Sequence, residues 1–160
     1  MIGAADGACP LFLAARGAEV TVADADLTAV LSLEQRAMAE ALRGRIECEV
    51  VSLGGFAPRP GGFVGCVLEP SALADLSARD RGGLIARLKD ATPNGGRHVV
   101  MPGLPSRGAA AVLSSDTLRS QYGDWEVFEI ESVGRSRRNA GFIAVRRAQR
   151  RSETPMAVSN

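Results

Sequence analysis

Short apolar stretches alternate with stretches of helical character along most of this chain, and this alternation limits the folds that it can adopt. Strands that alternate with helices form parallel sheets whose faces are covered by the helices. The last two apolar stretches are too close together for a crossover helix, so we expect them to pair antiparallel at one edge. The expected strands are residues 1–4, 19–23, 45–53, 63–68, 97–101, 125–132 and 141–147, and the expected helices are residues 10–16, 27–42, 78–91 and 116–122.

The sequence therefore predicts an α/β domain with a doubly wound, mostly parallel sheet. Its first strand is shortened, and its last two strands form an antiparallel pair at the edge. A chain of 160 residues is long enough for one domain with a sizeable core. We place this domain at residues 1–148 and expect the polar residues 149–160 to form a disordered tail.

Local signals mark several helix ends. Pro10 suits the first turn of a helix, and Gly17 suits the position just after its end. Asp26 is placed to cap the second helix, and Ser77 with Asp80 has the form of a capping box before the third. Apolar residues recur near helical spacing in the second helix, namely Leu27, Val30, Leu31, Met38 and Leu42.

A run of small residues at positions 3–8 (GAADGA) follows the first strand, and Asp24 closes the next one. In doubly wound domains such a turn lets backbone N–H groups approach a nucleoside-bearing cofactor, and an acid about 20 residues later binds its ribose hydroxyls. Asp24 lies 21 residues after Gly3. Two structural alternatives stay open: the turn has no ligand, or Asp24 only caps the following helix.

The order of these elements resembles the class I S-adenosylmethionine-dependent methyltransferases, in particular the small enzymes of the tellurite-resistance type. Residues 3–7 (GAADG) resemble the glycine-rich loop of this family, and residues 11–24 (LFLAARGAEVTVAD) resemble the helix and strand after it. Residues 87–97 (RLKDATPNGGR) resemble its passage from helix through a KPGG turn to a strand. Residues 125–127 and 140–142 resemble its closing strand pair.

The resemblance implies that S-adenosylmethionine is the cofactor. The small-residue turn would contact this methyl donor with backbone groups, and the acid after the second strand would accept the ribose hydroxyls. Residues at the ends of the second and third strands would lie around the adenine. The residues implied are Gly3, Ala4, Ala5 and Gly7 in the turn, Asp24 for the ribose, and Ala25, Ser52 and Leu53 for the adenine.

The resemblance also implies a small-molecule acceptor for the methyl group. By this resemblance, Leu68, Glu69 and Pro70 would face the methyl group and the acceptor, because they lie at the carboxyl end of a central strand, where open α/β sheets bind their ligands. Glu69 is a candidate base or acceptor anchor, with an ordinary surface carboxylate as the alternative. Methyl transfer is an in-line displacement that mainly requires alignment and the exclusion of water, so we expect no metal.

The chain departs from the family pattern at three of these positions. Ala5 stands where the family has its second glycine, so a side chain occupies a backbone position that favours φ > 0. Met1 stands where an acid precedes the first glycine, and Ser52 where an acid lies near the adenine. Two interpretations follow: an N-terminally truncated relative with a degenerate donor loop, or a true translation start upstream of Met1.

Two other functions stay open. The chain could be a non-catalytic binding or scaffold protein that keeps the fold without the donor site. It could also be an NAD(P)-binding oxidoreductase in which Gly3, Ala5 and Ala8 form a G-x-A-x-x-A variant of the dinucleotide motif. The closing strand pair and the turn at residues 93–96 argue against the oxidoreductase.

Composition limits the partners and the compartment. The net charge of +1 gives no reason to expect nucleic acid or an anionic membrane as a partner. Three widely spaced cysteines fit neither a zinc site nor a disulfide framework, and no stretch approaches about 18 continuous apolar residues. We therefore expect a cytoplasmic monomer or homodimer without a membrane span or signal peptide.

We interpret one cluster of arginines as a solvated edge and tail: Arg135, Arg137, Arg138, Arg146, Arg147, Arg150 and Arg151.

Several reactive side chains are expected to have structural roles. His98, the single histidine, lies in an expected core strand and is interpreted as a hydrogen-bonded core residue rather than a base. Cys9 is interpreted as a packing residue rather than a nucleophile, and Asp6 as a solvated turn residue. For Tyr122 and Trp125 we favour packing over a place in the acceptor pocket.

Overall fold

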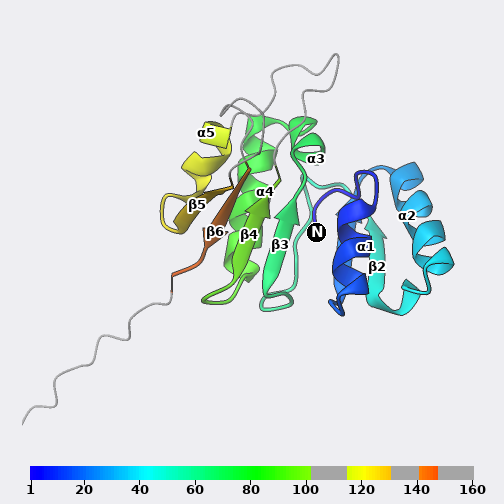
Figure 1. Ribbon diagram of the computed structural model, residues 1–160. Helices are drawn as coiled ribbons and strands as arrows, with labels where there is room; N and C mark the ends of the chain where they lie inside the picture. Colours follow the sequence, from blue (N-terminus) through cyan, green and yellow to red (C-terminus); the bar gives the residue numbers. More distant parts are fainter. Residues whose placement is uncertain (102–114, 131–140, 148–160) are drawn as a thin grey trace, which may run out of the picture.

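The computed structural model of the chain describes residues 1–101, 115–130 and 141–147. Helices and strands alternate along most of the chain up to β4, except that β3 follows β2 without a helix between them, and the two closing strands come last (Figure 1). The helices are α1 (Ala8–Ala15), α2 (Leu27–Ala39), α3 (Pro70–Ala74), α4 (Ala78–Ala91) and α5 (Ser115–Arg119), with 3-10 turns η1 (Arg43–Arg45) and η2 (Ser120–Tyr122). The strands are β1 (Val20–Asp24), β2 (Ile46–Val50), β3 (Gly65–Leu68), β4 (Arg97–Val100), β5 (Glu126–Ile130) and β6 (Gly141–Val145).

The sheet is mostly parallel, with an antiparallel pair at one edge. Strand β1 pairs parallel with β2, and β3 pairs parallel with β4. Strand β6 lies antiparallel between β4 and β5. The predicted doubly wound sheet and its closing strand pair are therefore confirmed.

Ile2 alone stands between the two halves of the sheet. It forms parallel bridges to Ala23 in β1 and to Leu68 in β3. Its N–H donates to the carbonyl of Val67 at 2.8 Å, and the N–H of Gly3 donates to the carbonyl of Ala23 at 2.9 Å. The predicted shortening of the first strand is confirmed, and the strand order is β2–β1–Ile2–β3–β4–β6–β5.

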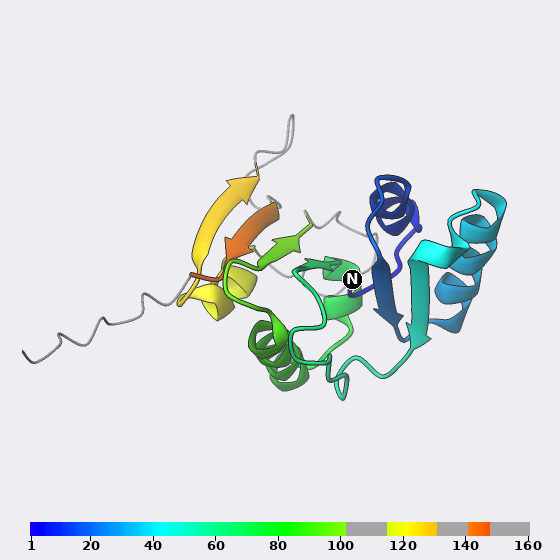
Figure 2. The ribbon, with the colours of Figure 1, turned by 90° about the horizontal axis from the view of Figure 1, so that it is seen from below.

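Helices lie on both sides of this sheet, with α1 on one side and α4 on the other (Figure 2). One hydrophobic cluster joins β1 to α1 and α2 through Val22, Leu11 and Leu33. The larger cluster joins β3, β4 and β6 to α4 and η2, with Leu88, Tyr122 and Phe142 among its members. Ile2 belongs to the second cluster and is 1% exposed, so the single central residue is fully packed.

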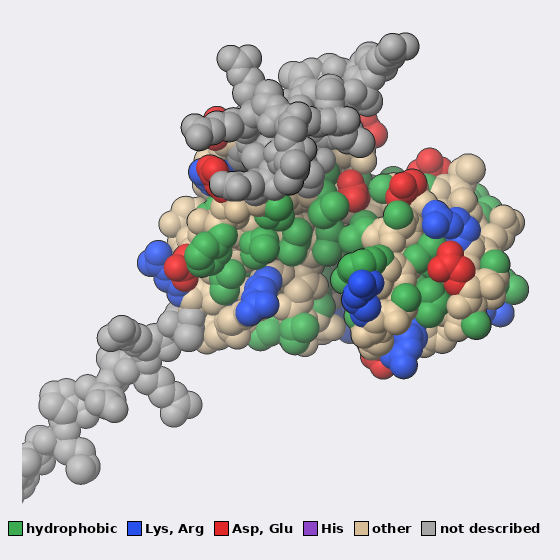
Figure 3. Space-filling model, viewed as in Figure 1, with side chains coloured by type: hydrophobic (Ala, Val, Ile, Leu, Met, Phe, Trp, Pro, Cys, Tyr) green, Lys and Arg blue, Asp and Glu red, His purple; other side chains and the backbone are tan. Residues whose placement is uncertain are grey.

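The face of β3, β4, β6 and β5 opposite α4 carries a row of apolar side chains. Val67, Val99, Ile143 and Phe128 are neighbours across the four strands. The first three are partly exposed and Phe128 is 50% exposed. Hydrophobic side chains gather over these strands in the space-filling view (Figure 3).

The helix-end signals are confirmed, but two details differ from the prediction. Helix α2 ends at Ala39 instead of Leu42, and the backbone of Ala41 is left-handed, with φ 56°. Of the apolar residues expected at helical spacing in α2, Val30 is buried, whereas Leu27, Leu31 and Met38 are 48–58% exposed. The core instead receives Val30, Leu33 and Ala37, because these share the face that packs on β1.

Helix α3 was not predicted. It has five residues and begins with Pro70, whose fixed φ suits the first turn of a helix.

None of the described helices is long and apolar enough to cross a membrane. The expected tail at residues 149–160 and the arginines at 135, 137, 138, 150 and 151 lie outside the described residues.

Candidate functional site

A pocket of about 490 Å³ lies at the carboxyl ends of β1 and β2. Its volume falls within the roughly 300–1,000 Å³ of small-molecule sites, and ligands of doubly wound sheets bind at this end of the strands. Acidic side chains gather at the corresponding upper edge of the molecule, between the regions of α3 and α2 (Figure 3). The pocket is lined by Asp24, Ala25 and Asp26 from the end of β1, Val50, Val51, Ser52 and Leu53 from the end of β2, and Ala72, Asp75 and Leu76 from α3 and the residues after it.

Asp24 connects this pocket to the small-residue turn. It is the last residue of β1, and only 9% of it is exposed. Its Oδ2 accepts a hydrogen bond from the N–H of Ala4 at 2.6 Å, and its Oδ1 accepts one from the N–H of Asp26 at 2.9 Å. A carboxylate has about four acceptor sites, so both oxygens retain capacity for a ligand.

The cap of α2 is Asp26 and not Asp24. The Oδ1 of Asp26 accepts hydrogen bonds from the N–H groups of Thr28 at 2.8 Å and Ala29 at 3.4 Å. The cap predicted for Asp26 is therefore confirmed. Because Asp24 does not cap the helix, its carboxylate at the pocket wall is available to bind a ligand.

The turn itself has three left-handed residues. The φ angles of Gly3, Ala5 and Gly7 are 87°, 49° and 77°. A side chain at Gly3 would meet the Cβ atoms of Ala72 and Glu69 at 2.8 Å, so the turn packs closely against the start of α3. Ala5 thus adopts the backbone conformation for which the family uses glycine.

Replacing Ala5 with glycine should stabilise the protein. The left-handed conformation costs an ordinary residue about 1–2 kcal/mol, and glycine avoids this cost. Glycine also gives the unfolded chain more conformational freedom, which cancels part of the gain in stability. We expect Ala5→Gly to raise the free energy of unfolding by about 0.5–1 kcal/mol in chemical denaturation. Ala86→Gly, in the exposed interior of α4, is the control and should lower it by about 1 kcal/mol. A loss of stability in Ala5→Gly would contradict the strain assigned to this turn.

Glu69 follows β3 and lies beside the turn. It precedes the first residue of α3 without capping it by its side chain, and it is half-buried. Burial raises the pKa of Glu69 above the usual value, and the charge of Asp6 raises it further. Asp6 is exposed, and its Oδ1 accepts a hydrogen bond from the N–H of Ala8 at 2.9 Å, as expected of a turn residue.

The thiol of Cys9 shows no activation. Burial raises its pKa, and the charge of Glu69 raises it further, so the thiolate is disfavoured at neutral pH. This agrees with the interpretation of Cys9 as a packing residue.

The structure brings together only part of the implied donor site. Asp24, Ala25, Ser52 and Leu53 all line the pocket. The turn residues Gly3, Ala4, Ala5 and Gly7, together with Leu68 and Glu69, are not part of its lining. The N–H of Ala4 is occupied by Asp24, and the side chain of Leu68 is fully buried in the core.

His98 has the structural role predicted for it. It is fully buried, with its Nε2 at 2.8 Å from the hydroxyl of Thr92 and its Nδ1 at 2.8 Å from the hydroxyl of Tyr122. Burial lowers the pKa of His98 to about 4, and the charge of Lys89 contributes to this shift. Tyr122 and Trp125 are also buried, in ring contact with His98 and with each other, so the prediction that they pack is confirmed.

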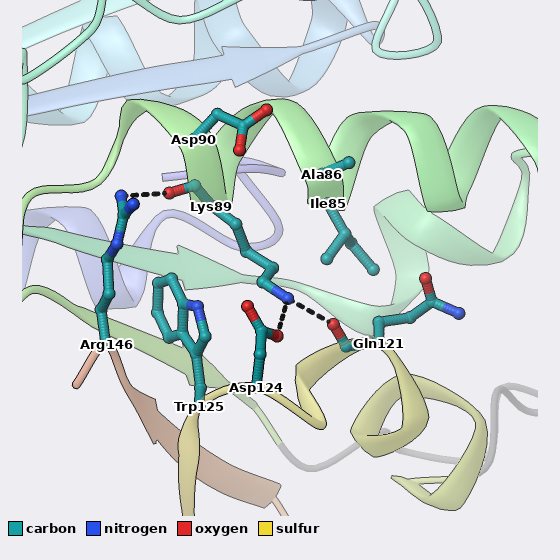
Figure 4. A pocket seen from close by; sticks show the side chains of 8 residues that line it. All are labelled: Ile85, Ala86, Lys89, Asp90, Gln121, Asp124, Trp125 and Arg146. Atoms are coloured by element: carbon teal, nitrogen blue, oxygen red, sulfur yellow. Dashed lines mark hydrogen bonds and ion pairs between the residues drawn. The ribbon is translucent and has the colours of Figure 1, made fainter. Parts of the chain in front are cut away.

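A second, smaller hollow of about 180 Å³ lies between α4, η2 and β6 (Figure 4). Lys89 forms an ion pair with Asp124 and donates to the carbonyl of Gln121 at 2.8 Å. Arg146 donates to the carbonyls of Lys89 and Thr92. Because both cations are held by the protein itself, we assign this hollow a structural role in fastening α4 to the closing strands.

Six of the described lining residues were not among the predicted site residues. Asp26, Val50 and Val51 adjoin predicted ones in the sequence, whereas the other three come from a different segment. Ala72, Asp75 and Leu76 belong to α3 and the segment after it, which reach the ends of β1 and β2 only in three dimensions. Asp75 lies 51 positions from Asp24, and no spacing rule connects them. The one available signal was the position of residues 70–76 just after a central strand, where ligands bind in this class of sheet.

No protein-family model matches the chain, and no curated protein sequence matches it either. Solved structures do resemble it. An S-adenosylmethionine-dependent methyltransferase from Methanosarcina mazei has a TM-score of 0.67 at 16% identity, over 91% of this chain and 90% of that one. TehB from Haemophilus influenzae has a TM-score of 0.70 at 18% identity, over 91% of this chain but only 56% of TehB.

A third similar structure contains a bound nucleoside. It is the N-methyltransferase NodS from Bradyrhizobium japonicum in complex with S-adenosyl-L-homocysteine, with a TM-score of 0.69 at 19% identity. The alignment covers 91% of this chain and 75% of NodS. At these identities the likeness concerns the fold, and it shows that the chain has the Rossmann-like fold shared by these methyltransferases.

Proposed function

We propose that the chain binds S-adenosylmethionine in the pocket at the ends of β1 and β2 and transfers its methyl group to a small-molecule acceptor. The observation that carries this proposal is the convergence of Asp24, Ala25, Ser52 and Leu53 on one pocket. These residues lie at the ends of two different strands, and the family resemblance of the sequence assigns all four to the donor. The similar structures support the proposal, since one of them holds S-adenosyl-L-homocysteine.

The chemistry of the lining fits an adenosyl group that carries a cation. Val51, Leu53 and Leu76 offer apolar contact for a flat base. Three aspartates line the same pocket, at positions 24, 26 and 75, and among the described residues that line it none is basic. A carboxylate-rich wall attracts a sulfonium ion and repels phosphate, so the donor fits this pocket better than a dinucleotide with a pyrophosphate.

S-adenosylmethionine, when bound, supplies an activated methyl group on a good leaving group. The residues of the chain then have to bind, orient and exclude water. Asp24 is positioned to bind ribose hydroxyls, because its carboxylate is fixed by two backbone N–H groups. Glu69 is the candidate for holding the acceptor or taking its proton, since a carboxyl with a raised pKa is a stronger base than an exposed one.

The two other functions make different demands on the pocket. An NAD(P)-binding oxidoreductase needs a phosphate site at the small-residue turn, but there the N–H of Ala4 is occupied by Asp24. A scaffold protein without a donor site does not require a pocket with this lining. Thermal unfolding with added ligands distinguishes both of these functions from methyl transfer.

Thermal unfolding with added ligands tests the proposal. A ligand that binds only the folded state at about 100 times its Kd stabilises it by about 2.7 kcal/mol, which raises Tm by roughly 5–10 °C in a domain of this size. We expect S-adenosylhomocysteine and S-adenosylmethionine at millimolar concentration to raise Tm in this way, and NAD to leave it unchanged. A shift with NAD alone would favour the oxidoreductase, and no shift with any of the three would favour the scaffold.

A further inference from the structure

One carboxylate of the pocket wall, that of Asp75, has no hydrogen-bond or ion-pair partner in the described part of the chain. Asp75 directly follows α3 and lines the pocket beside Leu76. The side chain is exposed, so it can reach a ligand without a change in the fold.

The other two aspartates of the pocket are already engaged by backbone N–H groups. Asp24 accepts from Ala4 and Asp26, and Asp26 accepts from Thr28 and Ala29. Asp24 therefore fixes the turn, and Asp26 fixes the start of α2. Asp75 differs from both, because its whole acceptor capacity is available to a ligand.

The position of Asp75 indicates which part of a nucleoside it meets. Asp24, at the end of β1, is the buried acid placed for the ribose. Asp75 adjoins Leu76, and the apolar side chains that suit a flat base are Leu76, Val51 and Leu53. An ionised carboxylate only accepts hydrogen bonds, so it favours a base edge with N–H donors over one with a carbonyl.

We propose that Asp75 is a specificity-determining residue that accepts a hydrogen bond from the exocyclic amino group of the adenine. This inference rests on the proposed function, since it assumes an adenosyl ligand in this pocket. Ser52, on the β2 side of the pocket, has no charge and both donates and accepts through its hydroxyl, so it cannot make this distinction. Selection for an amino group therefore comes from Asp75, just after α3, and not from the hydroxyl of Ser52.

Two ligands that differ on this edge of the base provide the test. S-adenosylhomocysteine has the amino group and an unprotonated N1, whereas S-inosylhomocysteine has a carbonyl oxygen at the place of the amino group and an N–H at N1. Isothermal titration of the intact chain should show that the adenosyl ligand binds at least about tenfold more tightly, the effect of one hydrogen bond to a charged group. Asp75→Ala should weaken the adenosyl ligand about tenfold and change the inosyl ligand less than about twofold, so that the preference disappears.

Asp26→Asn is the matched control within the same pocket. Asparagine caps a helix as well as aspartate does, so this variant removes one negative charge and keeps α2 in place. We expect it to retain the preference for the adenosyl ligand. Thermal unfolding of each variant should show that it is folded, as expected for exposed positions.

The possible results separate this inference from the proposed function. If Asp75→Ala weakens both ligands equally, Asp75 acts only through its charge and the assignment to the amino group is wrong. If neither affinity changes, Asp75 does not contact the ligand. If the unmodified chain binds neither ligand, the proposed function fails, and the inference fails with it.

Discussion

Asp24→Ala should strongly weaken donor binding and destabilise the protein. Asp24 is 9% exposed, and its carboxylate accepts two backbone hydrogen bonds, from Ala4 and from Asp26. A hydrogen bond to a charged group contributes about 1.5–3 kcal/mol, so the loss of both should lower the free energy of unfolding by about 3 kcal/mol or more. The ribose contacts that we propose for Asp24 would be lost as well, which should weaken S-adenosylhomocysteine by about a hundredfold or more.

Two further variants separate these effects. Asp24→Asn keeps one carbonyl acceptor and the shape of the side chain, so we expect a smaller loss of stability but still at least about a tenfold loss of affinity. Asp90→Asn removes a carboxylate that lines the second hollow and should leave both quantities unchanged. Calorimetric titration and urea denaturation provide the two readouts. Affinity of Asp24→Ala within about threefold of the unmodified chain would contradict the site.

Acid should destabilise the protein through His98. The hydroxyl of Thr92 donates to the carbonyl of Leu88 at 2.7 Å, so it must accept from Nε2 of His98. Nδ1 is then unprotonated and accepts from the hydroxyl of Tyr122. When the imidazole is protonated, Nδ1 donates to the Tyr122 oxygen instead of accepting from it, so the buried Tyr122 hydroxyl proton loses this acceptor.

The pKa of His98, about 4 in the folded state, fixes the direction and range of this effect. Between pH 4 and the usual histidine pKa of about 6.5, the unfolded chain binds a proton that the folded chain does not. Stability is thus fully present above about pH 6.5 and falls as the pH approaches 4, by about 3 kcal/mol in total.

Urea denaturation at a series of pH values measures this loss. His98→Gln is the matched variant, because its amide can donate to Thr92 and accept from Tyr122 without titrating. His98 is the only histidine of the chain, so the difference between the two proteins isolates its proton from those of the carboxylates. Parallel pH profiles for the two proteins would show that His98 is not the source of acid sensitivity.

Much of the fold could be predicted because its signals are local. Asp26 and Ser77 cap the helices that they were expected to cap, with hydrogen bonds to Thr28 and Asp80 respectively. Gly17 has the left-handed backbone expected after a helix, with φ 93°. These features depend on neighbours within a few residues, and the sequence displays such neighbours directly.

Other features depend on contacts across the chain. The five residues of α3 are too short to show a helical period, and no local pattern indicates that this segment packs on Gly3. The buried face of α2 is decided by β1 and not by its own apolar spacing, so Leu31 and Met38 remain exposed. Part of the pocket lining was predicted from the ends of two strands, whereas Asp75 joins this lining only through the fold.

The central claim is that the pocket at the ends of β1 and β2 binds an adenosyl group. Backbone amide chemical shifts in isotope-labelled protein, followed by NMR during titration with S-adenosylhomocysteine, test it most directly. We predict that the largest changes fall on residues 24–26, 51–53 and 75–76, with little change at Lys89 and Asp124 around the second hollow. Changes centred on the second hollow, or none at millimolar ligand, would contradict the claim.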